Sequence, residues 1–127
     1  FDLCHYGHAL MFEECKEYCD YLIVGVQSDP CIDRPEKNKP VQSHEERVGI
    51  ISSLKFVDEV VTYDTEADLI EVLKKIQPDV RILGADHEGT PFTGHELPIK
   101  CIFNTRDHVY STSELRKRVF EAEKSKT

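Results

Sequence analysis

The sequence lacks long apolar runs and has few residues that break regular structure. Its longest apolar run, Tyr21 to Val26, is far shorter than the roughly 20 residues that a membrane span requires. Six glycines and six prolines among 127 residues exclude a fibrous or low-complexity chain. We therefore expect one globular domain over residues 1–127 and no membrane insertion. No basic and apolar leader opens the sequence, so we expect a cytoplasmic location.

Positive charge is in the minority, with 16 Lys and Arg against 24 Asp and Glu and a formal net charge of -8. Generic nucleic-acid binding needs a basic face, so we expect no nucleic-acid partner. The basic residues nevertheless gather in two segments, which suits a small anionic ligand. These residues are Arg34, Lys37, Lys39, Arg47 and Lys55 in the first segment, and Arg106, Arg116, Lys117 and Arg118 in the second.

Five cysteines, an odd number without a small-domain framework, predict reduced thiols and no disulfides. Cys4, His5 and His8 are residue types that bind zinc, but the paired spacing typical of structural zinc sites is absent. We therefore expect no metal held by protein side chains. Cys15 and Cys19 are more simply explained as core residues.

Two common catalytic motifs are also missing. Gly89 to Gly94 has the glycine spacing of a P-loop, but His95 and Glu96 follow where Lys and Ser or Thr are required. There is no G-x-S-x-G elbow, and none of the cysteines lies in a recognisable nucleophile motif. Covalent catalysis has no obvious candidate, which favours direct displacement.

The apolar pattern predicts alternating helices and strands. We predict helices over 8–19, from a Ser43 to Glu46 capping box to about residue 54, over 65–76, and from a Ser111 to Glu114 capping box onward. Strands are predicted over 21–26, 59–63, 80–83 and 99–103, with a loop over 84–94. Continuous apolar strands are typical of parallel sheets. We therefore expect an α/β fold, a Rossmann-like doubly wound parallel sheet with helices on both faces.

Two polar clusters fall at predicted helix N-termini, His5-Tyr6-Gly7-His8 and Ser111-Thr112-Ser113. In such sheets, ligands bind where helix N-termini present free backbone N–H groups. The two imidazoles add further donors, and Gly7 lets a phosphate approach the backbone. From the residues alone, a helix start with solvated histidines explains the first cluster equally well.

The same clusters carry a family resemblance. Residues 1–8, Phe1-Asp2-Leu3-Cys4-His5-Tyr6-Gly7-His8, resemble the F-D-x-x-H-x-G-H signature of the cytidylyltransferases in the H-x-G-H nucleotidyltransferase superfamily. Residues 106–113, Arg106-Asp107-His108-Val109-Tyr110-Ser111-Thr112-Ser113, resemble their second signature, R-T-x-G-I-S-T-[ST]. Further similarity in residues 20–24, 55–60 and 84–87 extends the resemblance over nearly the whole chain. The family members that act on glycerol 3-phosphate are the most similar.

The resemblance implies transfer of a cytidylyl group from CTP to a phosphorylated alcohol such as glycerol 3-phosphate, with release of pyrophosphate. The transition state spreads negative charge over the α-phosphate and the leaving group, so positioned cations and N–H donors would supply the catalysis. Mg²⁺ would accompany the nucleotide, held mostly by phosphate and water. Because relatives are commonly dimers, a homodimer is expected.

The resemblance also implies roles for individual residues. His5, His8, Lys37 and Lys39 would be catalytic, with the two histidines on the α-phosphate. The nucleotide would be bound by Asp2, Gly7, Gly84, Asp86, Arg106, Ser111, Thr112 and Ser113. Arg47 and Lys55 would bind the phosphate of the acceptor. Without the resemblance, Ser111 is also a good helix N-cap, and a structural or solvated charge is the more common explanation for each of the basic residues.

The sequence departs from the family pattern in two places. Asp107, Val109 and Tyr110 replace the threonine, glycine and isoleucine of the second signature, and the carboxylate of Asp107 would repel a triphosphate. Family members also carry a strand ending in Gly-Thr before the position of Phe1. We therefore expect the natural chain to begin earlier and the sheet formed by these residues to lack its central strand.

Two alternatives stay open beside the cytidylyltransferase. The first is an adenylyltransferase of the same superfamily that uses ATP and a sugar phosphate or pantetheine phosphate. The second is a nucleotide-binding module that has lost turnover through the changes around Asp107. The sequence marks the base pocket too poorly to choose between CTP and ATP.

Overall fold

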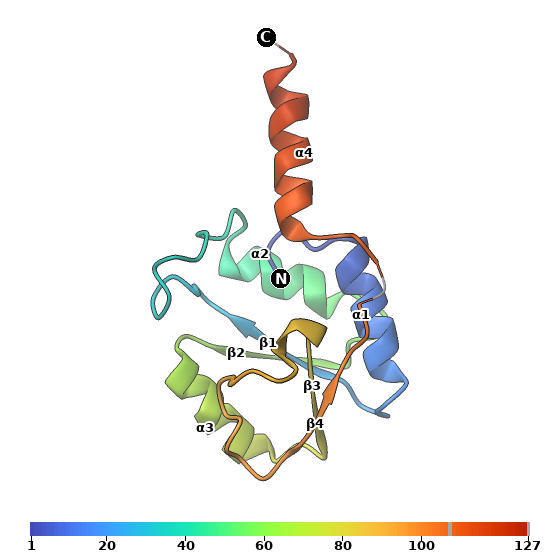
Figure 1. The fold of residues 1–127 in the computed structure, drawn as a ribbon, viewed down its shortest axis with the longest axis vertical. Helices are drawn as coiled ribbons and strands as arrows, with labels where there is room; N and C mark the ends of the chain where they lie inside the picture. The colour runs from blue at the N-terminus through green and yellow to red at the C-terminus, as the bar shows by residue number, and fades with distance from the viewer. Residues whose placement is uncertain (107, 127) are drawn as a thin grey trace.

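The computed structural model describes residues 1–106 and 108–126, in which helices and strands alternate as predicted (Figure 1). The elements are α1 (Tyr6–Lys16), β1 (Ile23–Gln27), α2 (His44–Ser52), β2 (Glu59–Tyr63), α3 (Glu66–Ile76), β3 (Val80–Leu83), the 3₁₀ helix η1 (Ala85–His87), β4 (Lys100–Phe103) and α4 (Thr112–Lys124). The order of helices and strands is confirmed. The predicted loop over 84–94 was wrong in one detail, because it contains η1.

Several element boundaries differ from the prediction. Helix α1 begins at Tyr6 because His5 caps it, and it ends at Lys16 rather than continuing to Cys19. The capping box at Ser43 forms with both of its hydrogen bonds. At Ser111 only one bond of the predicted box is observed among the described residues, in which the side chain accepts from Glu114 N.

The strands form two parallel pairs. β1 pairs with β2, and β3 pairs with β4. Within the described residues no ladder joins the two pairs, so the parallel sheet has the gap that we expected. A cavity of about 1050 Å³, lined in part by residues of β1, β3, α1 and α3, accompanies the break in the sheet. The break matches the central strand position that the sequence analysis expected to be unfilled.

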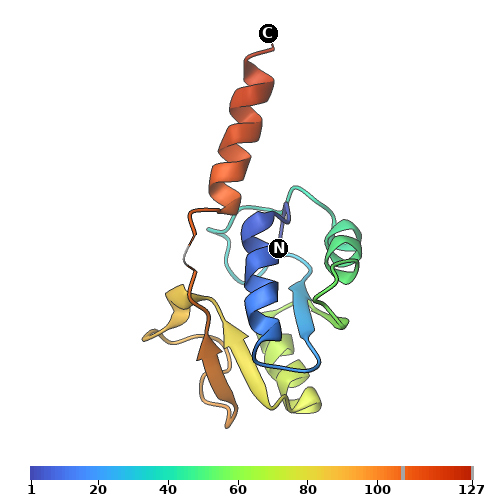
Figure 2. The ribbon, with the colours of Figure 1, turned by 90° about the vertical axis from the view of Figure 1, so that its right-hand side faces the viewer.

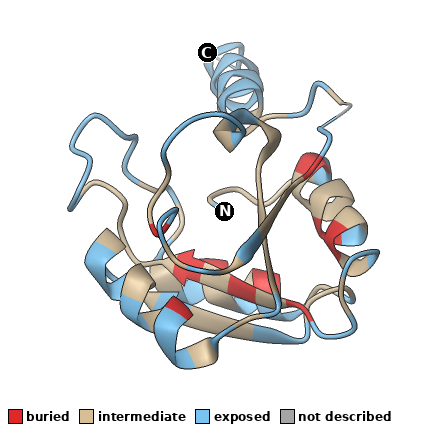
Figure 3. Ribbon diagram, turned by 60° about the horizontal axis from the view of Figure 1, so that its bottom comes forward, coloured by how far each residue is buried: buried red, intermediate tan, exposed pale blue. Residues whose placement is uncertain are grey.

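The core lies where α1, β1 and α2 meet (Figure 3). Its buried members are Phe12, Cys15, Leu22, Val24, Val26 and Ile51. Helix α2 packs against β1 and β2, while α3 packs against β2. Figure 1 shows α2 and α3 on opposite sides of this strand pair. Cys15 is buried and Cys19 packs beside the core, as predicted, and all five cysteines are free.

Helix α4 projects away from the rest of the chain (Figures 1 and 2). None of its described residues is buried, and Val119 and Phe120 are exposed. An ion pair of 3.6 Å between Arg116 and Asp2 joins its first turns to the start of the chain. The beginning of α4 therefore positions it against the rest of the molecule. No helix in the described ranges is long and apolar enough to cross a membrane.

Candidate functional site

The H-x-G-H segment forms the start of α1, and an imidazole occupies the N-cap position where Ser, Thr, Asp or Asn is usual. Nδ1 of His5 accepts a hydrogen bond of 3.0 Å from Gly7 N. Nδ1 of His8 accepts one of 3.2 Å from His5 N. Together these bonds make a reciprocal capping box, and the two rings stack with their centroids 4.0 Å apart. The three-residue spacing of His5 and His8 is therefore the spacing that a reciprocal capping box requires.

The capping bonds also determine which ring nitrogen carries the proton. Because Nδ1 of each ring accepts from a backbone N–H, a neutral ring carries its proton on Nε2. Nε2 of His5 lies 3.2 Å from Oγ1 of Thr112, so His5 donates to this hydroxyl. The cap thus leaves Nε2–H as the donor of each histidine, and in His5 this donor is directed at Thr112.

Burial keeps both rings neutral. It lowers the pKa of His8 from 6.5 to about 3, with a further contribution from neighbouring His5. Burial also lowers the pKa of His5, and the nearby charges of His108 and Arg106 lower it further. At neutral pH the rings are therefore uncharged hydrogen-bond donors.

The second signature lies across a cavity of about 310 Å³ from the first. Ser111 is the N-cap of α4, and its Oγ accepts from Glu114 N at 3.1 Å. Of the predicted site residues, the structure brings the following together around this cavity: His5, Gly7, His8, Gly84, Asp86, Arg106, Ser111 and Thr112. Two helix N-termini, α1 and α4, therefore face one cavity, as the sequence pattern suggested for an anion site.

Glu14 of α1 holds the loop that carries the second signature. Its carboxylate accepts from the backbone N–H of Thr105 at 3.1 and 3.2 Å and from the hydroxyl of Thr105 at 3.1 Å. Arg106 follows in the left-handed conformation with a φ of 41°, and its Nη2 donates to Tyr110 O at 3.3 Å. These contacts place the Arg106 charge close enough to contribute to the lowered pKa of His5.

Several predicted residues lie outside the lining of this cavity. The carboxylate of Asp2 accepts from Val41 N and Gln42 N, each at 2.9 Å, so it anchors the loop before α2. Lys37 and Lys39 belong to that loop, and Ser113 is exposed on α4. The catalytic and binding roles expected for these residues stay predictions.

The two residues expected to bind the acceptor phosphate are also elsewhere. Arg47 is only 4% exposed, and it donates to three backbone carbonyls: Gln27 O at 2.6 Å, Ser28 O, and Gln42 O at 3.3 Å. Nζ of Lys55 lies 5.0 Å from the ring centroid of Phe56. In this structure Arg47 joins the end of β1 to the loop before α2, and Lys55 lies against its neighbour.

Sequence reasoning missed three polar residues of the cavity, Glu14, Asn104 and His108. His108 falls on the variable position of the second signature, so the motif carries no signal for it. The only hint was a third histidine close to Arg106 and Ser111 in the sequence. Asp107, the departure that carries a charge, lies outside the described residues.

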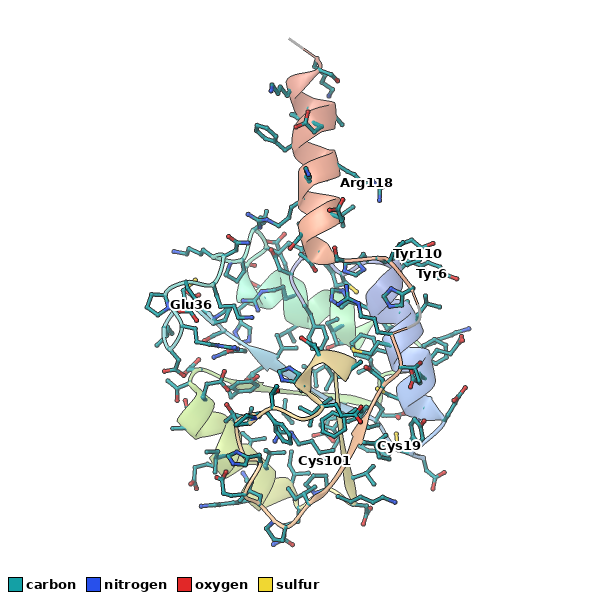
Figure 4. The ribbon with its side chains drawn as sticks, in the orientation of Figure 1. Tyr6, Cys19, Glu36, Cys101, Tyr110 and Arg118 are labelled. Atoms are coloured by element: carbon teal, nitrogen blue, oxygen red, sulfur yellow. The ribbon has the colours of Figure 1, made fainter. Side chains whose placement is uncertain are left out.

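The other two departures from the signature are exposed. Val109 is 87% exposed, and Tyr110 packs edge-on against Tyr6 with ring centroids 5.2 Å apart. Figure 4 shows these tyrosines side by side, one from the start of α1 and one from the loop before α4. The tyrosine pair therefore links the two signatures at the edge of the site.

The chain matches the cytidylyltransferase-like family over residues 1–118 and belongs to that family. The fold and the site together define a nucleotidyltransferase domain of Rossmann-like architecture, which confirms the family resemblance and the predicted fold class.

The chain is also similar to curated proteins. It is 34% identical over 125 residues to the bifunctional protein HldE of Campylobacter curvus, and this alignment covers 98% of this chain and 26% of the relative. It is 33% identical over 120 residues to HldE of Helicobacter pylori, with coverage of 94% and 26%. The chain thus spans about a quarter of the length of these relatives.

One solved structure shares the fold. The lipopolysaccharide core biosynthesis protein from Thermoplasma volcanium superposes with a TM-score of 0.60 at 24% identity. The match covers 97% of this chain and 82% of the other chain. At this identity, the comparison establishes the common architecture.

Proposed function

We propose that this domain transfers the nucleotidyl group of ATP to the phosphate of a sugar phosphate and releases pyrophosphate. The observation that carries this proposal is the contact between His5 and Thr112. It joins the two family signatures around one cavity of about 310 Å³, which two helix N-termini face. Such a cavity suits a chain of phosphates, because backbone N–H groups and imidazole donors converge on it.

In the proposed reaction, an oxygen of the acceptor phosphate attacks the α-phosphorus of the nucleotide. A new P–O bond forms, the bond between the α-phosphorus and the bridging oxygen breaks, and its electrons leave with pyrophosphate. His5 and His8 would donate from Nε2 to the α-phosphate oxygens as charge develops there. The start of α4, with Ser111 and Thr112, and the Arg106 charge would hold the β- and γ-phosphates.

Mg²⁺ would enter with the nucleotide and neutralise the leaving group. In the described part of the chain, no group of three or more His, Cys, Asp or Glu residues is arranged to hold a metal ion. The ion would therefore rely on phosphate oxygens and water for most of its ligands, as Mg²⁺ usually does with nucleotides.

The sugar phosphate is supported by the fold neighbour, which is described as a lipopolysaccharide core biosynthesis protein. Lipopolysaccharide cores are built from sugars. A sugar phosphate is also one of the acceptors of the ATP-using alternative that the sequence leaves open. The curated relatives are named bifunctional proteins, and this chain aligns with only part of them. We assign nucleotidyl transfer to the aligned part.

A second candidate keeps CTP as the nucleotide and a phosphorylated alcohol such as glycerol 3-phosphate as the acceptor. Both signatures resemble those of cytidylyltransferases, and the family description is cytidylyltransferase-like. A homodimer, expected from the same resemblance, is tested separately by light scattering on the purified protein.

Pyrophosphate release separates these candidates. The protein is incubated with Mg²⁺ and either ATP or CTP, each with sugar 1-phosphates, glycerol 3-phosphate or pantetheine phosphate. Turnover with ATP and a sugar phosphate is expected, whereas turnover only with CTP and glycerol 3-phosphate would establish the second candidate. Nucleotide binding without turnover would identify a binding module. His8→Ala should abolish release, and His95→Ala, an exposed histidine outside the cavity, is the matched control.

A further inference from the structure

His108 is a third imidazole in the phosphate cavity. Besides lining the cavity, its ring packs over Gly7: a Cβ placed on Gly7 would lie 2.8 Å from Cε1 of His108. The same Cβ would lie 2.8 Å from Cε1 of His5. His108 therefore reaches the start of α1 from the loop before α4, and it lies beside the two histidines of the first signature.

The orientation of the His108 ring is set by its own loop. Its Nδ1 accepts a hydrogen bond of 3.1 Å from Tyr110 N. Because Nδ1 accepts this bond, a neutral His108 ring carries its proton on Nε2, as in His5 and His8. Cε1, the ring atom that joins Nδ1 to Nε2, lies over Gly7, so this donor is one bond away from the atom that reaches the first signature.

The Nε2–H of His108 differs from that of His5 in being uncommitted. His5 donates to Thr112, whereas His108 Nε2 has no hydrogen-bond partner among residues 1–106 and 108–126. The backbone N–H of Tyr110 orients the His108 ring at the wall of the cavity. The Nε2–H of this ring is therefore a donor for a ligand that occupies the cavity. In an anion site the natural acceptor is a phosphate oxygen.

We propose that His108 donates from Nε2 to the phosphates of the bound nucleoside triphosphate, and so acts as a third imidazole ligand beside His5 and His8. This inference rests on the proposed function, since it takes a nucleotide as the occupant of the cavity. The competing explanation is structural: His108 only caps Tyr110 N and holds the loop.

A pair of isosteric variants distinguishes these explanations. His108→Asn keeps an acceptor near the position of Nδ1 and removes the donor at Nε2, whereas His108→Gln places an amide N–H near Nε2 and gives up the cap. Triphosphate affinity is measured by titration calorimetry with ATP and with CTP. We expect His108→Asn and His108→Ala to bind the triphosphate about tenfold more weakly or worse, and His108→Gln to retain most of the affinity. His95→Asn should equal the wild type.

The outcomes separate this inference from the proposed function. If the wild type binds neither nucleotide and releases no pyrophosphate, the proposed function fails and the inference fails with it. If the wild type is active but His108→Asn binds like it while His108→Gln is weak, His108 has only the capping role. Equal affinity in every variant overturns the inference as well.

A measurement on the unmodified protein guards against misfolded variants. The ring nitrogens of each histidine are observed by ¹H–¹⁵N NMR, with His108 assigned, before and after saturation with the triphosphate that binds. A shift of His108 Nε2 together with those of His5 and His8 is expected. Movement of the His5 and His8 signals without that of His108 Nε2 would exclude His108 from the phosphate site.

Discussion

Cε1 of His108 lies over Gly7 at the point where the two signatures meet, so close that a larger residue at position 7 would have to displace the ring. A Cβ there would lie 2.8 Å from Cε1 of His108 and 2.8 Å from Cε1 of His5, nearer than real Cβ contacts come. The glycine of the H-x-G-H segment is therefore explained by the two rings packed over it. A left-handed conformation is not the reason, because Gly7 is not among the glycines with positive φ.

Gly7→Ala should displace both rings and weaken nucleotide binding about tenfold or more, while the protein still folds, because a shifted ring loses its hydrogen bond to phosphate. The control is Gly49→Ala in α2, where an added Cβ meets nothing within 4 Å. That control should be neutral or should raise the free energy of unfolding by about 0.5 to 1 kcal/mol. Calorimetric titration and urea unfolding of both variants check the prediction. Unchanged affinity in Gly7→Ala would contradict it.

The partly buried ring of His8 should make the protein sensitive to acid. Its pKa falls from 6.5 to about 3 on folding, so between these values the unfolded chain binds a proton that the folded chain does not. The free energy of unfolding contributed by His8 is thus fully present above about pH 6.5 and is lost as the pH falls toward 3. His8→Asn, which keeps an acceptor for the cap at His5 N, should lose less stability over this range than the wild type does. Urea unfolding at several pH values tests this, and identical slopes in the two proteins would disprove it.

The carboxylate of Glu14 should matter for the site more than for the fold. It accepts both the backbone N–H and the hydroxyl of Thr105, and so holds the loop that leads to Arg106. Glu14→Ala should weaken nucleotide binding several-fold and speed hydrogen exchange at Thr105, with a stability cost of about 1 to 2 kcal/mol. Glu13→Ala, one position away on the exposed side of α1, is the control and should leave both unchanged. Unaltered exchange at Thr105 in Glu14→Ala would rule out the anchoring role.

Arg47 should behave as a structural residue. Its buried guanidinium donates to carbonyls of Gln27, Ser28 and Gln42, and those acceptors lose their partner in Arg47→Met. The free energy of unfolding should fall by about 2 kcal/mol or more. Lys55→Met, with its ammonium lying over Phe56, should change stability little. A fully stable Arg47→Met that has lost only affinity for the acceptor would instead restore the phosphate-binding role predicted from the family.

Much of the fold was predictable because its signals are local. Helix starts at Ser43 and Thr65 follow from hydrogen bonds between residues three apart, and both capping boxes form. The strand segments 59–63 and 80–83 were predicted with their observed ends, because short segments rich in branched apolar residues are local patterns. The start of α1 was placed too late, since a histidine is an unusual N-cap and the propensity for that position gave no warning.

The sequence by itself determined the family, the order of the elements and the parallel direction of the strands, because periodicity, capping and signature spacing are properties of neighbouring residues. Only the tertiary structure decided that His5 meets Thr112, that His108 joins them over Gly7, and that Arg47 is buried against carbonyls. These contacts link segments far apart in the chain, and they depend on the paths of the loops. No local pattern specifies such a path, because it results from packing of the whole domain.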